Sequence, residues 1–239
     1  MKSRKATRRD VLAAGVTGAA AAALTPRVFG RSLPQDEKTA ETRPAMQHTY
    51  VARDYSGLVG MPGFNEALLR NHFKLYEGYV KNVNRILADL EAFRKDDKLA
   101  TPAAAELRRR LGWEFDGMRL HEIYFDNLGG KEPLRPEGKL GAALVKQWGS
   151  IEAWMADFKA VGEMRGIGWA ALVQDGWSGR LYNVWIEEHD GGHFAACPVL
   201  LLMDVFEHAY LVDNASKKAE YIDAFFRNVD WTTAERRLI

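Results

Sequence analysis

The sequence contains one cysteine among its 239 residues, Cys197, so an intrachain disulfide cannot stabilise it. Long hydrophobic runs are also lacking. The longest apolar stretch, residues 11–24, has about 14 residues, mostly alanine, glycine and valine. It is too short and too weakly hydrophobic to span a bilayer comfortably. The sequence therefore excludes a disulfide scaffold and predicts no stable membrane insertion.

A strong charge of one sign is absent as well, because 33 Lys and Arg residues balance 32 Asp and Glu residues. The balance is uneven along the chain, since residues 1–30 hold six of the basic side chains and one acidic side chain. The remaining 27 basic and 31 acidic residues give a net charge near −4. A mildly acidic body of this kind gives no electrostatic reason to expect nucleic acid as a partner.

Residues 1–30 have the features of an export signal. Arg8 and Arg9 precede the short apolar stretch, and this arrangement resembles a twin-arginine signal peptide. Such a signal implies a periplasmic or other extracytoplasmic location and export of a protein already folded around its cofactor. The alternatives are a single N-terminal anchor and a disordered basic tail, and no clear motif fixes a cleavage site near Phe29 and Gly30.

The remaining chain divides into three segments. Residues 31–60 carry prolines and charges without periodicity and are typical of a linker or irregular arm. Within residues 61–133, apolar side chains recur every three or four positions from Asn65 for roughly 30 residues, and Thr101-Pro102 begins a second helix. These segments predict a long antiparallel helical hairpin.

Residues 134–239 predict a C-terminal α/β domain. Helices are expected at 140–148 and 151–164, a strand hairpin at 168–174 and 180–188, and two further helices at 217–229 and 230–238. The apolar run 199–203 predicts a buried central strand. The expected fold class is α+β, with a three-stranded antiparallel sheet flanked by helices.

Three histidines and one aspartate occur in apolar surroundings. His72 and His121 lie on apolar faces of the two long helices, and Asp204 and His208 follow the 199–203 run. One buried histidine is usually a hydrogen-bonded core residue, but an unpaired buried carboxylate costs several kcal/mol. A cation would satisfy all four groups, and a mixed nitrogen and oxygen site suits iron, manganese or zinc.

Several motifs resemble those of the iron/manganese superoxide dismutase family, in the family's order. They are DVFEHAY at 204–210, YVKNVN at 79–84, HEIYFDNLGG at 121–130, GSIEAWMADFKA at 149–160, GIGW at 166–169 and YIDAFFRNVDW at 221–231. The resemblance covers residues 65–239. It implies a mononuclear iron or manganese ion in each subunit, superoxide as substrate, and assembly as a homodimer or homotetramer.

The resemblance also assigns roles to individual residues. It implies that His72, His121, Asp204 and His208 are the metal ligands. It places Tyr79 beside the substrate channel, Trp169 in the aromatic wall of the site, and His189 next to the metal-bound solvent. Glu207 matches a glutamate that reaches across the dimer interface to a ligand histidine of the other subunit.

The chain departs from the family's pattern at several places. His72 precedes Tyr79 by seven residues instead of eight, which leaves Asn71 at the ungapped ligand position; His72 is preferred because asparagine is a poor ligand. The family's second histidine in this helix is replaced by Leu75 or Tyr76, its second interface tyrosine by Leu211, and a tryptophan by Phe206. These changes predict a more apolar gateway.

Other questions stay open from the sequence. Gly117 stands where iron-type members often carry a solvent-contacting glutamine, so the layout is closer to manganese-type and metal-flexible members. The sequence does not choose between the two metals. Lys74 and Arg119 are possible substrate-steering residues, although a solvated charged face is the preferred interpretation. Two alternatives to dismutase activity are a non-haem iron oxygenase and a catalytically silent metal-binding interaction protein.

Overall fold

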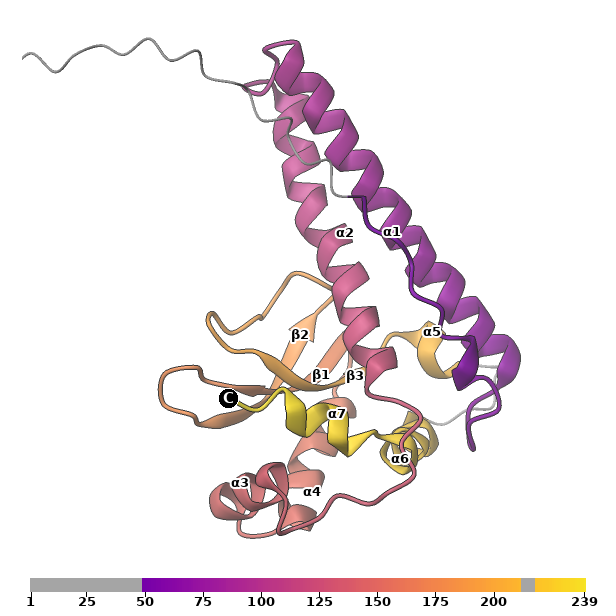
Figure 1. Ribbon diagram of the computed structural model, residues 1–239, viewed down its shortest axis with the longest axis vertical. Coiled ribbons are helices and arrows are strands. Elements are labelled where there is room, and N and C mark those ends of the chain that lie inside the picture. Colours follow the sequence, from indigo (N-terminus) through magenta and orange to yellow (C-terminus); the bar gives the residue numbers. More distant parts are fainter. Residues whose placement is uncertain (1–48, 212–217) are drawn as a thin grey trace, which may run out of the picture. The chain divides into compact units, whose positions relative to one another are not determined.

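Two long helices and a three-stranded sheet with shorter helices make up the part of the chain that the computed structural model describes, residues 49–211 and 218–239 (Figure 1). The described residues all belong to one compact unit. The predicted export signal, most of the predicted linker and His48 lie outside the described residues. The elements in chain order are η1 Ser56–Leu58, α1 Glu66–Lys95, α2 Pro102–Asp126, α3 Lys139–Trp148, α4 Ile151–Gly162, β1 Gly168–Gln174, β2 Leu181–Glu187, β3 Val199–Asp204, α5 Glu207–Tyr210, α6 Lys218–Asn228 and α7 Trp231–Arg236.

The helical hairpin begins at two capped positions. The Asn65 side chain accepts a hydrogen bond from the Leu68 amide, and the Thr101 hydroxyl accepts one from the Ala104 amide. Each cap satisfies a backbone N–H that has no partner within its helix. The buried face of α1 packs along α2, which confirms the predicted hairpin (Figure 1).

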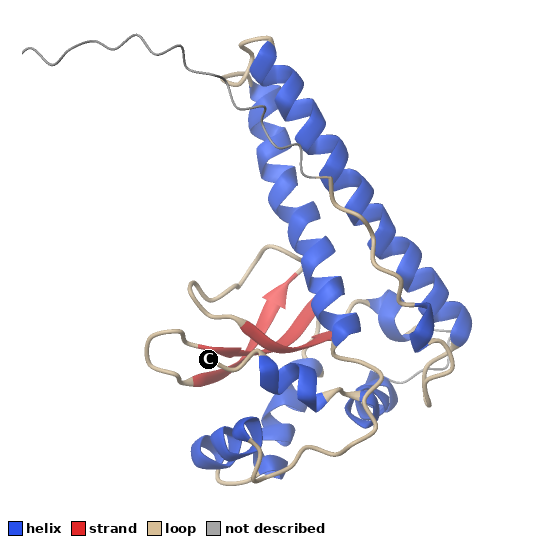
Figure 2. Ribbon diagram, in the orientation of Figure 1, coloured by secondary structure: helices blue, strands red, loops and turns tan. Residues whose placement is uncertain are grey.

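The sheet has the strand order β2-β1-β3, with all neighbours antiparallel. The expectation that residues 199–203 form the central strand is therefore wrong: β1 is central and β3 is an edge strand. The apolar run is buried because α2 and α7 cover this edge (Figure 2). The Asn127 side chain donates to the Leu202 carbonyl at 3.2 Å and Arg237 donates to the Leu200 carbonyl at 3.1 Å, so the outward carbonyls of the edge are paired.

The shorter helices follow the predicted signals. Ser150 caps α4 through the Ala153 amide, and Asp230 caps α7 through the amides of Thr232 and Thr233. The sequence did not reveal η1 or α5, each of at most four residues, because a single turn leaves no periodicity to detect. Among the described residues, no helix is both long and apolar enough to cross a membrane.

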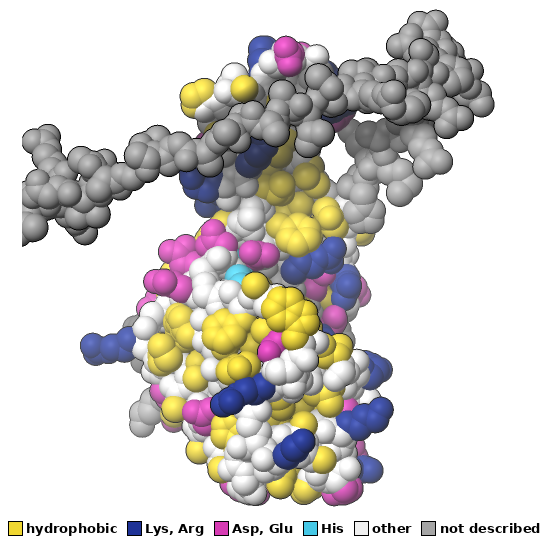
Figure 3. Space-filling model, turned by 90° about the vertical axis from the view of Figure 1, so that its left-hand side faces the viewer, with side chains coloured by type: hydrophobic (Ala, Val, Ile, Leu, Met, Phe, Trp, Pro, Cys, Tyr) yellow, Lys and Arg dark blue, Asp and Glu magenta, His cyan; other side chains and the backbone are white. Residues whose placement is uncertain are grey.

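One face of the molecule carries apolar side chains that the core does not absorb (Figure 3). Trp177, in the turn between β1 and β2, is 90% exposed, and Ile239 is 70% exposed. All seven residues of β1, in contrast, are buried. The core is therefore centred on β1, and the turn beyond it is surface.

Candidate metal centre

Four elements bring the predicted ligand residues together. His72 comes from α1, His121 from α2, Asp204 from the end of β3, and His208 from α5, and one nitrogen or oxygen atom of each lies within 4.8 Å of the others. His72 is buried within this group, whereas Asn71 is exposed. The seven-residue spacing therefore places His72, rather than Asn71, in the cluster.

Asp204 Oδ2 lies at the middle of the cluster. Its distances to the Nε2 atoms are 3.0 Å for His72, 3.2 Å for His208 and 3.8 Å for His121. Ligands bound at about 2.1 Å to one metal ion, at angles of 90° to 180°, lie about 3.0–4.2 Å apart. All three distances suit ligand atoms that share one ion.

The hydrogen bonds of His121 leave one of its nitrogens free for a metal. Its Nδ1–H donates to the Gly117 carbonyl at 2.6 Å, so the neutral ring presents an unprotonated Nε2 to the cluster. That Nε2 and the Nδ1 of His72 are buried side-chain atoms without a hydrogen-bond partner. A buried, unpartnered imidazole nitrogen facing a carboxylate fits a metal ligand, because a cation satisfies both groups.

Burial and charge set the protonation of the cluster. Burial lowers the pKa of both His72 and His121, so that both rings are neutral near pH 7. Burial also acts to raise the pKa of Asp204, but the charge of His208 and the hydrogen bonds from His208 and His72 outweigh it and hold this pKa well below its usual range. The site is thus an anionic carboxylate among imidazoles, the donor set that a redox metal ion prefers.

Comparison with known proteins agrees with this donor set. Residues 136–237 match the C-terminal domain of iron/manganese superoxide dismutases. A superoxide dismutase [Fe] of Cupriavidus metallidurans is 36% identical over 182 residues, which cover 74% of this chain and 89% of the relative. The chain belongs to the iron/manganese superoxide dismutase family. Similar relatives include a superoxide dismutase [Fe] of Pyrobaculum aerophilum, 35% identical over 72% of this chain and 82% of the relative, and superoxide dismutase [Mn] 2 of Haloferax volcanii, 32% identical over 71% and 84%.

Beside the cluster of this family member, Trp169, His189 and Tyr79 form a chain of hydrogen bonds. The Trp169 Nε1–H donates to His189 Nδ1 at 3.2 Å. Indole is only a donor, so His189 Nδ1 is unprotonated and the ring proton is on Nε2, which donates to Tyr79 Oη at 2.7 Å. The three residues that the sequence placed around the site are therefore linked in one defined tautomer.

Gly117 makes room for Tyr79. A Cβ atom at Gly117 would lie 2.6 Å from Tyr79 Cδ1, closer than such atoms approach in proteins. The Tyr79 ring therefore occupies the space where a side chain at position 117 would begin, and position 189 supplies the hydrogen-bonding group instead. The missing glutamine at Gly117 was the sequence signal for this exchange.

Aromatic rings enclose the histidines. Phe206 stacks on His189, with centroids 4.9 Å apart, and on His208, with centroids 5.2 Å apart. Trp113, which the sequence did not single out, lies with its centroid 4.5 Å from that of His189. Trp113 lies eight residues before His121 on the same helix. No sequence motif marks a tryptophan at this spacing, so the sequence did not predict its place in the site.

Three predicted residues lie away from the cluster. Glu207 is exposed. Within the described residues, its side chain forms no hydrogen bond or ion pair with any of the four cluster residues. Arg119 pairs with Glu122 at 2.5 Å and packs against the rings of Tyr50 and Phe115, so its charge is already compensated. Lys74 is exposed, in agreement with a solvated face.

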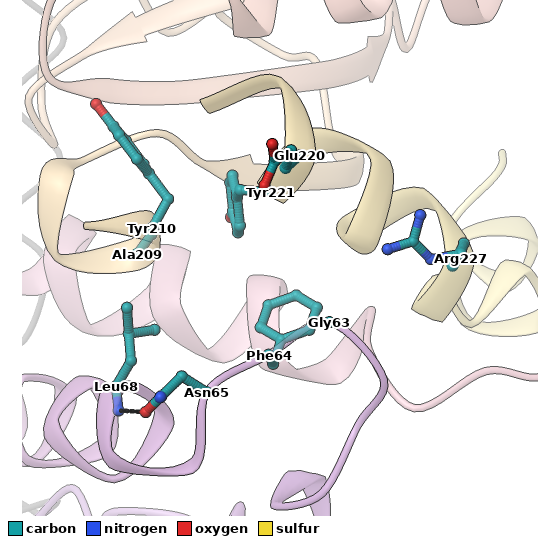
Figure 4. A pocket seen from close by; sticks show the side chains of 9 residues that line it. All are labelled: Gly63, Phe64, Asn65, Leu68, Ala209, Tyr210, Glu220, Tyr221 and Arg227. Carbon is teal, nitrogen blue, oxygen red and sulfur yellow. Dashed lines mark hydrogen bonds between the residues drawn. The ribbon is translucent and has the colours of Figure 1, made fainter. Parts of the chain in front are cut away.

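Two hollows border this region. The first lies between the start of α1 and helices α5 and α6 (Figure 4), and none of the four cluster residues lines it. Its wall includes Tyr221, whose hydroxyl donates to the Asp204 carbonyl at 2.6 Å. The second is a groove lined by His72 and His208 together with Leu75 and Leu211, so this groove, not the first hollow, reaches the metal-binding cluster.

The low proton affinity of His189 predicts a pH-dependent stability. Burial lowers its pKa to about 4, whereas an unfolded histidine titrates near 6.5. As the pH falls below 6.5 the unfolded state binds the proton first, so folding loses stability down to about pH 4. For the metal-free protein, His189→Gln should reduce the stability lost between pH 7 and pH 5 by on the order of 1 kcal/mol, after allowance for solvent screening.

Chemical denaturation of both proteins at the two pH values measures this difference. The other histidines are common to both proteins and cancel in the comparison. Equal losses of stability in the variant and the parent would show that His189 takes up its proton in the folded state.

Proposed function

We propose that this chain is a superoxide dismutase in which His72, His121, Asp204 and His208 hold one iron or manganese ion. The observation that carries the proposal is the convergence of these four side chains, with the unprotonated Nε2 of His121 buried and facing Asp204. When bound, the ion supplies the one-electron chemistry that oxidises one superoxide to O2 and reduces the next to H2O2.

The reduction of superoxide to H2O2 consumes two protons. Tyr79, oriented by His189, is positioned to donate one of them. Tyr79 Oη accepts from His189 Nε2–H, which leaves the hydroxyl hydrogen of Tyr79 available for donation. Burial, then the charges of Asp204 and Glu114, raise the pKa of Tyr79, so the phenol stays protonated at neutral pH. We assign Tyr79 as the proton donor and His189 as the residue that orients its hydroxyl group, and water from solvent returns the proton to Tyr79 after each transfer.

Trp169 and Phe206 form the wall of the site. Trp169 fixes the His189 tautomer, and the fully buried Trp169 ring packs edge-on against His121 with centroids 5.0 Å apart. Excluding water around the cluster strengthens the electrostatic interactions within it. Both iron and manganese suit this donor set, and relatives named for each metal are similar to this chain.

A homodimer would complete the groove beside the cluster. Leu75 and Leu211 line the groove and are 43% and 47% exposed, and His208 at its base remains partly exposed. In a two-fold dimer this groove would receive the same surface of a second copy, with Glu207 of one subunit approaching His208 of the other. Light scattering measures the expected mass of a dimer or of a tetramer built from two dimers.

Export by the twin-arginine route and a periplasmic location are part of the proposal. Their support is Arg8 and Arg9 followed by the short apolar stretch of residues 11–24. Fractionation of cells that produce the parent protein and an Arg8→Lys, Arg9→Lys variant tests this point, since only the parent should reach the periplasm.

A superoxide dismutation assay combined with metal analysis tests the function. Natively produced protein should carry near-stoichiometric iron or manganese and should lose its activity when the metal is removed. Protein that carries one of these metals near stoichiometry yet does not accelerate dismutation would contradict the function and favour a catalytically silent metal-binding protein. Oxygen consumption with an organic substrate would instead indicate an oxygenase.

A further inference from the structure

Trp113 has no role in the proposed mechanism, although its ring contacts both Tyr79 and His189. Its centroid lies 4.5 Å from that of His189 and 5.5 Å from that of Tyr79. Ring contacts on two sides of a hydrogen bond restrict how its donor and acceptor can rotate. What holds Trp113 in place therefore bears on the geometry of the His189–Tyr79 bond.

Two charged side chains grip Trp113. The indole Nε1–H donates to Glu188 Oε2 at 3.0 Å, and the Arg110 guanidinium lies 4.1 Å from the ring centroid. Arg110 also donates to Glu114 Oε1 at 2.8 Å, and the buried Glu114 accepts from Asn82 of α1 at 3.1 Å. These contacts connect both long helices to the segment after β2.

The segment after β2 needs such an anchor because Glu188 has an unfavourable backbone conformation. Its φ is +49°, in the left-handed region that residues other than glycine rarely adopt and that costs about 1 kcal/mol or more. The neighbouring His189 side chain enters the site from this turn. Two hydrogen bonds of Glu188 stabilise the turn: its amide donates to the Ile167 carbonyl at 3.2 Å, and its carboxylate accepts from Trp113.

We propose that Trp113, held between Arg110 and Glu188, is a positioning residue that keeps His189 Nε2–H directed at Tyr79 Oη. The Glu188–Trp113 bond fixes the turn that carries His189, and the indole ring limits rotation of the imidazole. The effect of Arg110, Trp113 and Glu188 on catalysis rests on the proposed dismutase function. The state of the His189 proton, however, can be measured in metal-free protein and does not depend on activity.

The direct test is the exchange of the His189 Nε2–H with water, followed by NMR of metal-free protein with 15N-labelled histidine. We expect a slowly exchanging signal in the parent and exchange at least about 10-fold faster in Glu188→Ala and Trp113→Phe. Glu188→Gln should restore slow exchange, because its amide oxygen accepts the same hydrogen bond. Alanine at φ +49° is as strained as glutamate, so the alanine variant isolates the loss of the carboxylate.

Glu187→Ala is the matched control, since Glu187 is exposed and precedes Glu188 directly. In metal-loaded protein, Glu188→Ala and Trp113→Phe should lower kcat about 10-fold at unchanged metal content, whereas Glu188→Gln and Glu187→Ala should stay near the parent value. If Trp113→Phe does not fold, Glu188→Ala decides, because Glu188 is on the surface.

Parental exchange and parental kcat in Glu188→Ala would overturn the proposal. If the exchange rates change as expected but metal-loaded parent protein does not dismutate superoxide, the positioning role of Trp113 is confirmed and the proposed function is wrong.

Discussion

His208→Ala should remove both metal retention and dismutase activity. The variant loses one of the four converging groups and leaves Asp204 with less positive charge nearby, so the pKa of this buried carboxylate rises towards the value that burial favours. An ion held by three protein ligands instead of four is bound less tightly, and any protonation of Asp204 competes further with metal binding. We expect metal content to fall to a small fraction of one ion per chain and activity to fall at least about 100-fold, more than for loss of a residue that only supports a ligand.

His193→Ala is the matched control for this loss. His193 is a histidine of the same chain that lies outside the cluster, where its Nε2–H donates to the His189 carbonyl at 2.8 Å. Metal analysis by mass spectrometry should therefore find nearly full occupancy in His193→Ala. Full occupancy in His208→Ala would show that His208 is not a ligand.

Gly117→Ala should separate activity from metal binding. The added methyl group would lie 2.6 Å and 2.7 Å from two carbon atoms of the Tyr79 ring, so the ring must move by roughly 1 Å. Such a shift breaks the Tyr79–His189 hydrogen bond, and a misplacement of this size can cost about 100-fold in rate. Metal should be retained, because His121 bonds to the backbone carbonyl of Gly117, which the substitution keeps.

Gly112→Ala provides the comparison within the same helix. No atom lies within 4 Å of a Cβ built at Gly112, so this variant should keep its activity and gain up to about 1 kcal/mol of stability from the helix propensity of alanine. Steady-state kinetics and thermal unfolding of both variants measure the contrast. Parental kcat in Gly117→Ala would show that the exact position of Tyr79 is unimportant for turnover.

Local signals in the sequence were sufficient for most of the fold. The caps at Asn65, Thr101, Ser150 and Asp230 mark helix starts because a short polar side chain satisfies a free backbone amide at each position. The position of β3 in the sheet was not predictable in this way. A run that is apolar throughout indicates a buried strand. Whether its outer edge pairs with another strand or is covered by a helix depends on residues such as Asn127 and Arg237, which are distant in sequence.

The cluster was accessible from the sequence because its members are unusual where they stand. A histidine on an apolar helix face and an aspartate after an apolar strand carry an energetic cost that a cation can offset. Trp113 and Glu188 carry no such signal. A tryptophan on a helix and a glutamate after a strand are ordinary, and only the fold brings them within 3.0 Å, 75 positions apart in the chain.

Anomalous X-ray scattering from crystals of an active preparation tests the central claim most directly. Data collected on either side of the iron and manganese absorption edges should show one strong peak per chain, within bonding distance of the Nε2 atoms of His72, His121 and His208 and of Asp204 Oδ2. An active preparation whose iron or manganese peak lies elsewhere in the chain, or which shows no such peak, would contradict the account.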